Sequence, residues 1–217
     1  MRLKWLVAVA LICGIPAFGL PILIDNTGVG SGGAGTIDPN WLIGGGSAYV
    51  TTGSPSDYPF AWSGGPIWMA NNADSQWISP QPTYSALPPV TDATGEWLFT
   101  TTFDLTGLDP GTAVIPGRWL VDNEGANILI NGVSTGQTAG SWSAWTGFTI
   151  DSGFLPGLNT LTFVINNTGG ADGNPVALRA EFLEPTADPV PEPATFVLIG
   201  AGLLGLGLLR RTRRTAN

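Results

Sequence analysis

The sequence predicts an all-β sandwich, and three observations support this fold class. Apolar and polar side chains alternate along residues 96–105, which is the period of a strand with one buried face. Turn signals rich in glycine, proline, asparagine and aspartate recur at short spacing, as they do between the strands of sandwiches. Between the two terminal segments, no stretch has the 3.6-residue period of an amphipathic helix. We therefore expect one sandwich of about eight to ten short strands.

Each strand is expected where a short apolar or alternating run lies between turn signals. In chain order the expected strands are residues 21–24, 47–52, 67–70, 77–79, 96–105, 112–121, 126–130, 148–151, 161–166 and 176–182. Pro116 followed by Gly117 predicts a bend or bulge, since proline cannot donate a ladder hydrogen bond. Asn131 followed by Gly132 is the strongest short hairpin signal. Alternation in the last strand should turn Arg179 and Glu181 toward water.

The N-terminal segment has the order of a secretory signal. Arg2 and Lys4 precede the apolar residues 5–12, and small residues end the segment, so signal peptidase is expected to cut after Gly19. Cys13 raises a lipoprotein signal as an alternative, although Ile12 before it is large for that use. Cleavage after Gly19 removes the single cysteine, so the mature protein would contain no disulfide.

The C-terminal segment has a motif, an apolar run and a basic end. Val190, Pro191, Glu192 and Pro193 form the motif, and the prolines keep it extended. Residues 194–209 carry no charge and, as a helix rising about 1.5 Å per residue, would extend roughly 24 Å. The basic end, which would stop transfer on the cytoplasmic side, consists of Arg210, Arg211, Arg213 and Arg214.

This order of motif, helix and arginines resembles the PEP-CTERM sorting signal of Gram-negative bacteria. The resemblance implies an exported protein whose tail is cut near the motif by an exosortase, a membrane-embedded cysteine protease. Its expected partners are signal peptidase, the exosortase and, transiently, the inner membrane. Its expected location is the cell surface or the extracellular space. An ordinary C-terminal membrane anchor is the alternative interpretation of the same residues.

The middle of the chain also has a family resemblance. Motifs in the order found in many PEP-CTERM ectodomains are IDNTG at residues 24–28, SQWI at 75–78, TTFDLTGLD at 101–109 and RWLVDNEG at 118–125. The last motif, continued to ILING at residues 128–132, is similar to galactose-binding-like jelly rolls, including sugar-binding modules of glycoside hydrolases. The resemblance implies a single jelly-roll-like β-sandwich and transfers no ligand, because that fold carries many functions.

These observations divide the chain into five parts. We expect a signal peptide (residues 1–19), a β-sandwich ectodomain (20–185), a linker with the VPEP motif (186–193), a transmembrane helix (194–209) and a basic cytoplasmic tail (210–217). A signal helix and a transmembrane helix would therefore flank the sandwich.

Charge and composition narrow the function of the ectodomain. Residues 20–193 contain two of the eight basic residues and all sixteen acidic ones, which gives a net charge of −14. This excess disfavours nucleic acid as a partner. The chain has no histidine, which excludes Ser-His-Asp and Cys-His catalysis and the usual histidine-based zinc sites. Carboxylate pairs such as Asp122 and Glu124 remain for glycosidase chemistry, but acids two residues apart are frequent in an acidic chain.

Two candidate binding sites follow from side-chain chemistry. Asp25, Asp38 and Asn40 offer hard oxygen ligands for a structural calcium, the one cofactor considered. Asp122 and Asn123 either shape a turn through local hydrogen bonds or accept hydroxyl groups of a sugar.

Tryptophans supply the second half of the sugar hypothesis. Trp62, Trp68, Trp142 and Trp145 lie in or beside loops, where a ring either stacks on a sugar or plugs the end of the sandwich. Extending the parity of residues 148–151 backwards places Trp142 on the core side and Trp145 on the wet face beside Gly147.

We therefore expect a non-enzymatic surface or matrix protein with a structural or adhesive role in an exopolysaccharide or biofilm layer. A glycan-binding module that contacts extracellular polysaccharide is the alternative, and a glycoside hydrolase is a distant third.

Overall fold

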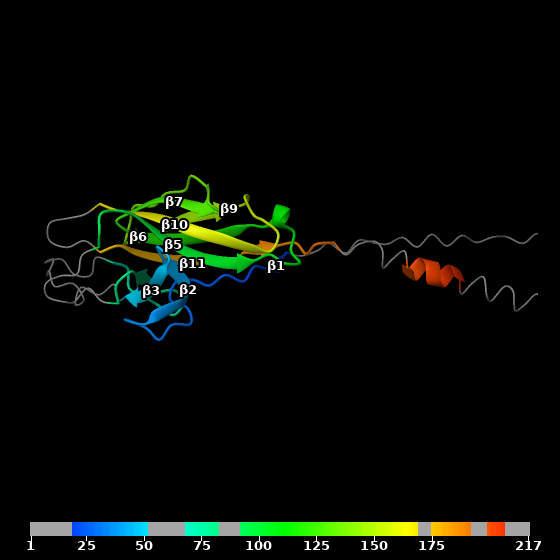
Figure 1. The fold of residues 1–217 in the computed structure, drawn as a ribbon, viewed down its shortest axis with the longest axis horizontal. Coiled ribbons are helices and arrows are strands. Elements are labelled where there is room, and N and C mark those ends of the chain that lie inside the picture. Colours follow the sequence, from blue (N-terminus) through cyan, green and yellow to red (C-terminus); the bar gives the residue numbers. More distant parts are fainter. Residues whose placement is uncertain (1–18, 52–67, 83–91, 169–174, 192–198, 207–217) are drawn as a thin grey trace, which may run out of the picture.

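The computed structural model describes residues 19–51, 68–82, 92–168, 175–191 and 199–206, and its regular structure is mainly β-strand (Figure 1). The strands are β1 (Leu20–Pro21), β2 (Ile37–Ile43), β3 (Gly46–Thr51), β4 (Trp77–Ser79), β5 (Gly95–Asp104), β6 (Ile115–Asp122), β7 (Glu124–Ile130), β8 (Val133–Ser134), β9 (Thr146–Ile150), β10 (Leu158–Asn167), β11 (Ala177–Phe182) and β12 (Thr186–Ala187). One 3₁₀ turn, η2 (Pro110–Thr112), precedes β6. The all-β prediction is confirmed.

Ten of these strands form one folded sheet with the order β8-β7-β10-β5-β2-β3-β4-β11-β6-β9. The sheet turns over at the β2–β3 hairpin, so that its two halves face each other as layers. The ring of Phe163 in β10 shows this, because its centroid lies 5.2 Å from Trp119 in β6 and 5.6 Å from Phe148 in β9. From β4 to β7 and from β9 to β11, successive strands alternate between the layers, which is the jelly-roll pattern.

Alternation along the strands builds the core, as predicted. In β5, Phe99, Thr101 and Phe103 are buried while Leu98 and Thr102 are exposed. The neighbouring β10 pairs with β5 in an unbroken antiparallel register from Leu158 opposite Asp104 to Asn167 opposite Gly95. The predicted hairpin is confirmed, since Asn131 and Gly132 both have positive φ between β7 and β8.

Strand β2 was not predicted, and Pro39 lies inside it. The pairing of β2 with β3 is regular only at its ends, and the register shifts between Ile37 and Leu42. Proline cannot donate to a ladder, so it occupies the irregular part of the strand.

Three other expectations were wrong. Of the expected strand 21–24, only Pro21 belongs to a strand, because β1 ends there. The register of β6 against β9 runs without a shift through Pro116 and Gly117, and its register against β11 is unbroken from Asp122 to Gly117, so there is no bulge. Gly117 instead makes room for a neighbour: a Cβ there would clash with the Phe148 ring and lie 2.6 Å from the Glu181 carbonyl oxygen. The described part of the expected strand 67–70 is not a strand, since residues 68–70 cross the outside of the sheet.

The two ends of the sandwich meet. Leu20 of β1 lies opposite Ala187 of β12, and Pro21 lies opposite Thr186. The sandwich therefore continues past its expected boundary at residue 185. Residues 199–206 form a helix within the expected apolar segment, and in the described part of the chain no helix is long and apolar enough to span a membrane. The expected signal peptide, residues 1–19, lies outside the described residues except for Gly19.

Candidate functional surfaces

The outer face of β4, β11 and β6 carries a second hydrophobic cluster. Trp68, Trp77, Leu120 and Ala177 are buried there, and Met69 and Trp145 pack against them. Residues on these strands that point away from the core form its floor, and two non-strand segments cover it. The cover is held by backbone hydrogen bonds, from Met69 N–H to the Trp142 carbonyl (2.9 Å) and from Val121 N–H to the Ser141 carbonyl (2.9 Å).

Both arginines of the sandwich meet one carboxylate in this covered layer. Arg118 Nε donates to Glu181 Oε2 at 2.7 Å, and Arg179 Nη2 lies 3.5 Å from Glu181 Oε1. Ser75 joins them by donating to Glu181 Oε1 (2.7 Å) while accepting from Arg179 Nε (2.6 Å). Arg179 and Glu181 are buried, so the expectation that they face water was wrong. Both side chains point away from the main core, as the alternation predicts, but residues 68–76 cover this outer face of the sheet.

Trp145 lies against the same two arginines. The guanidinium carbons of Arg118 and Arg179 lie 4.5 and 5.0 Å from the centroid of its ring. Because the ring is half-buried and faces two cations, part of the surface that a sugar would need is already used. Trp145 is therefore a weaker candidate platform in the structure than in the sequence.

Asp122 is buried at the end of β6. Its Oδ2 accepts from Trp68 Nε1 at 2.8 Å, and its Oδ1 accepts from Asn123 Nδ2 at 2.7 Å. Burial raises the pKa of the Asp122 carboxyl to about 7, and the Trp68 hydrogen bond opposes that rise. Asp122 thus fixes Trp68 and Asn123, which agrees with a structural role, while a sugar contact at Asp122 or Asn123 stays a prediction.

The other candidate tryptophans have different environments. Trp142 is exposed, so its expected position on the core side was wrong: β9 begins at Thr146, and the parity does not extend back to Trp142. Trp68 is buried, and Trp62 lies outside the described residues.

Among the candidate calcium ligands, Asp38 has a carboxylate that already accepts hydrogen bonds. Asp38 is buried, and its carboxylate accepts from Gly28 N–H at 2.6 Å and Asn40 N–H at 2.9 Å. Burial raises the pKa of Asp38, while these two amides oppose the rise. Asn40 Nδ2 donates to the Val29 carbonyl, and the Asp25 carbonyl accepts from Trp41 Nε1. Within the described residues, no three acidic side chains gather to hold a metal.

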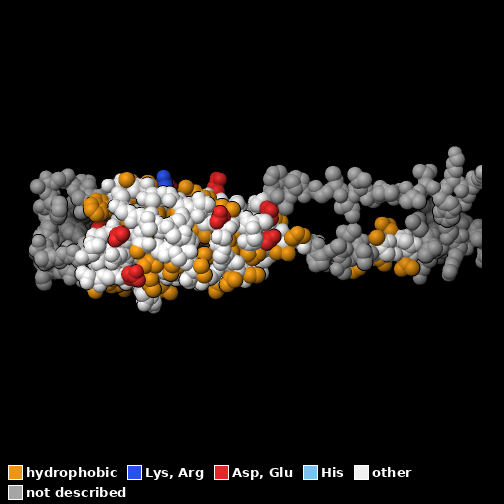
Figure 2. Space-filling view, turned by 90° about the horizontal axis from the view of Figure 1, so that it is seen from above, with side chains coloured by type: hydrophobic (Ala, Val, Ile, Leu, Met, Phe, Trp, Pro, Cys, Tyr) orange, Lys and Arg blue, Asp and Glu red, His pale blue; other side chains and the backbone are white. Residues whose placement is uncertain are grey.

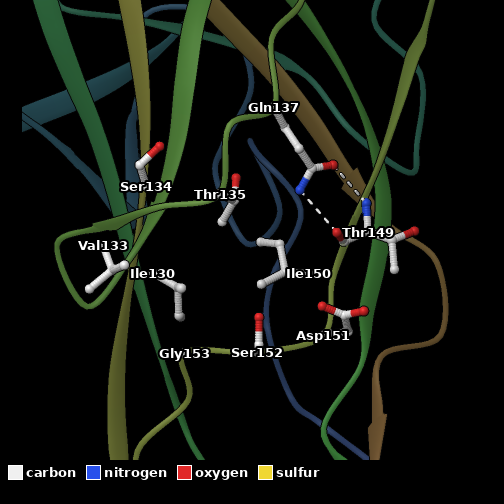
Figure 3. A pocket seen from close by; sticks show the side chains of 10 residues that line it. All are labelled: Ile130, Val133, Ser134, Thr135, Gln137, Thr149, Ile150, Asp151, Ser152 and Gly153. Carbon is white, nitrogen blue, oxygen red and sulfur yellow. Dashed lines mark hydrogen bonds between the residues drawn. The ribbon is translucent and has the colours of Figure 1, made fainter.

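A hollow that the sequence did not indicate lies at the open edge between the layers. It has a volume of about 280 Å³ and is lined by the β7–β8 hairpin, β9 and the residues after β9 (Figure 3). Ile130 and Ile150 are the buried apolar part of its lining, and hydroxyl, amide and carboxylate groups make up most of the remainder. The polar side chains of the lining are Ser134, Thr135, Gln137, Thr149, Asp151 and Ser152.

Gln137 fixes one wall of this hollow. Its Nε2 donates to the Thr149 carbonyl (2.9 Å), and its Oε1 accepts from Thr149 N–H (2.9 Å), as Figure 3 shows. The side-chain amide thus replaces a neighbouring strand along the free edge of β9. Only the three-dimensional structure brings these two residues together, since no sequence pattern links residue 137 to residue 149.

Acidic side chains are spread over the surface. Figure 2 shows them at several places on one face of the sandwich, with apolar groups between them. On this face they form no single acidic patch, so the negative charge there is distributed.

Comparisons with known proteins identify the C-terminal segment. Residues 189–214 match the PEP-CTERM protein-sorting motif. Among solved structures, the chain is similar to a family 35 carbohydrate binding module from an environmental isolate, with 17% identity and a TM-score of 0.27 over 47% of this chain and 77% of that chain. No curated protein matches the chain. The chain therefore carries, after an all-β sandwich, the PEP-CTERM sorting signal that marks proteins exported across the inner membrane to the cell surface or extracellular space.

Proposed function

We propose that this protein is a structural or adhesive component of the exopolysaccharide or biofilm layer, exported and processed by an exosortase. The observation that carries the proposal is the pairing of β1 with β12, followed after two residues by the VPEP motif. Among the residues that the structure describes, every buried core residue lies between Ile22 and Ala187, so the described core takes no contribution from residues 199–206 of the tail. A module closed at the end where its sorting signal begins is suited to display or release as a folded unit.

Charge and missing catalytic groups support a non-enzymatic role. The net charge of −14 over residues 20–193 favours a hydrated layer and association with divalent cations. The absence of histidine from the sequence removes the most common general base. We also propose that residues 1–19 act as a signal peptide and that the tail spans the membrane before processing.

Retention in the matrix tests this role. A strain lacking the gene would be complemented with the full chain, and the protein content and cohesion of its isolated exopolysaccharide would be measured. The proposal expects the protein in the matrix fraction and weaker cohesion without it. A chain truncated after residue 193, which keeps the sandwich and lacks the sorting helix, serves as the control for localisation. Equal cohesion with and without the gene would reject the adhesive role.

Glycan binding is a second candidate, and the hollow beside β9 favours it. Its volume is just below the usual range for small-ligand pockets, and its hydroxyl, amide and carboxylate groups can pair with sugar hydroxyls. Binding of the sandwich to a glycan array would be compared between the natural chain and Asp151→Asn. Asp104→Asn, which changes an exposed carboxylate at the end of β5, is the matched control. Loss of a glycan signal in the first variant alone would support this site.

A further inference from the structure

The segment just before the sorting motif is bonded to the sandwich on two sides. On one side, Ile22 N–H donates to the Pro185 carbonyl (2.8 Å), and β1 pairs with β12. On the other side, Val114 N–H donates to the Thr186 carbonyl (2.8 Å) and the Thr186 N–H donates to the Val114 carbonyl (3.0 Å). Thr186 is thus held like a residue in the middle of a sheet.

These bonds continue up to the first residue of the motif. Asp188 N–H donates to Thr112 Oγ1 (2.8 Å), and the Asp188 carbonyl accepts from Asp109 N–H (2.7 Å). Val190 N–H then donates to the Gly107 carbonyl (2.9 Å). Alternate amides, those of Thr186, Asp188 and Val190, therefore all point at the strip formed by residues 107–114, as in a strand paired along one edge.

The strip is itself fixed. Asp109 caps η2 by accepting from Gly111 N–H, and Thr112 Oγ1 also donates to the Asp109 carbonyl (2.9 Å). The segment that pairs with this strip is anchored at Ala187, whose side chain is buried in the main core. By contrast, Val190 and Pro191 are exposed. The backbone is thus hydrogen-bonded to the sandwich as far as the Val190 N–H, and the side chains of Val190 and Pro191 are accessible to solvent.

We infer that residues 107–114 form a clamp that sets the N-terminal limit of proteolysis, so that the sorting protease cuts after Val190 and not within residues 185–190. A protease binds its substrate as an extended segment and needs backbone groups that are free to pair. In residues 185–190, the Pro185 carbonyl, both backbone groups of Thr186 and Asp188, and the Val190 N–H are already bonded within the sandwich. Releasing them requires local unfolding. This inference rests on the proposed processing by an exosortase.

The clamp has a consequence for the mature protein. Processing after Val190 would leave residues 186–190 folded onto the sandwich, so the product would carry little free chain at its C-terminus. The expected linker of residues 186–193 would be reduced to the residues after Val190. If the processed protein were attached to another molecule through its new C-terminus, the sandwich would lie close to the point of attachment.

The test uses the full chain, purified in detergent from a strain without exosortase and treated briefly with a protease of broad specificity. Fragment masses should show C-termini at or after Val190. Thr112→Val removes both hydrogen bonds of Thr112 Oγ1, the one accepted from the Asp188 amide and the one donated to the Asp109 carbonyl. Cleavage within residues 185–190 should become at least roughly fivefold faster, which is the effect of losing one such bond. Thr102→Val, an exposed threonine of β5, is the matched control and should cleave like the natural chain.

Hydrogen exchange supplies a second measurement that requires no variant. The amides of Thr186, Asp188 and Val190 should exchange more slowly in the natural chain than in the same chain unfolded in denaturant. Early cleavage within residues 185–190 of the natural chain, or unprotected amides at these three residues, would overturn the clamp. Because no exosortase is present, these results do not depend on the proposed processing, which fails separately if cells with exosortase leave the tail uncut.

Discussion

The buried carboxyl of Asp122 makes the stability of the sandwich depend on pH. Burial raises its pKa from 3.8 to about 7, so the folded state keeps a proton that the unfolded chain releases. The contribution of Asp122 to stability is therefore full below pH 3.8, is lost as the pH rises from about 4 to about 7, and does not change further above that. At 1.36 kcal/mol for each pKa unit, the loss is roughly 4 kcal/mol.

Asp122→Asn should remove this dependence. An asparagine Oδ1 can still accept from Trp68 Nε1, but its amide cannot also accept from Asn123 Nδ2, which costs about 1 kcal/mol. At pH 4 the variant should therefore be slightly less stable than the natural sandwich. At pH 8.5 it should be more stable by roughly 3 kcal/mol, because the desolvation penalty of the charged carboxylate is gone.

Urea unfolding of residues 20–191, followed by tryptophan fluorescence at several pH values between 4 and 8.5, measures this difference. Other titrating groups are common to both proteins, so the difference isolates Asp122. Asp104→Asn is the control of opposite sign: hydrogen bonds from Thr106 lower the pKa of the Asp104 carboxyl, so its stabilising effect is lost as the pH falls. Parallel profiles for Asp122→Asn and the natural sandwich would refute the reasoning.

Three further substitutions test packing, two of them in the outer layer and one, Gly117→Ala, in the main core. Glu181→Gln should destabilise the sandwich by about 3–5 kcal/mol in urea unfolding, because Arg179 stays buried without its carboxylate, and a loss under about 1 kcal/mol would contradict the network. Gly117→Ala should cost about 1–3 kcal/mol because a Cβ meets Phe148, whereas Gly147→Ala, with ordinary contacts, should change stability little. Trp145→Ala should lower the melting temperature by several degrees through the lost contacts with the arginines, and an unchanged value would restore Trp145 as an open platform.

The sequence predicted the inner faces of the strands better than their outer faces. In β5 and β10, the alternation is a property of adjacent residues, so it could be recognised without the structure. In β11, the same alternation correctly separated Arg179 from Leu178. It could not show that Arg179 is buried, because the cover comes from residues about a hundred positions earlier.

The candidate sites failed or stayed open for a related reason. Backward extension of strand parity misplaced Trp142, since the strand begins only at Thr146. The hollow depends on Gln137 pairing with the backbone of Thr149, and the clamp depends on Thr112 meeting Asp188. Each of these contacts joins segments with no common pattern in the sequence. The sorting motif was found because its chemistry is contained in consecutive residues.

The central claim is that a self-contained sandwich is exported and separated from its sorting tail. The most direct measurement is the intact mass of the surface or extracellular form, isolated from a host with exosortase and from the same host without it. We expect a form that begins at Leu20 and lacks residues 194–217 in the first host, and a form that keeps residues 194–217 in the second. The same tail-bearing mass in both hosts would contradict processing and leave a plain membrane anchor.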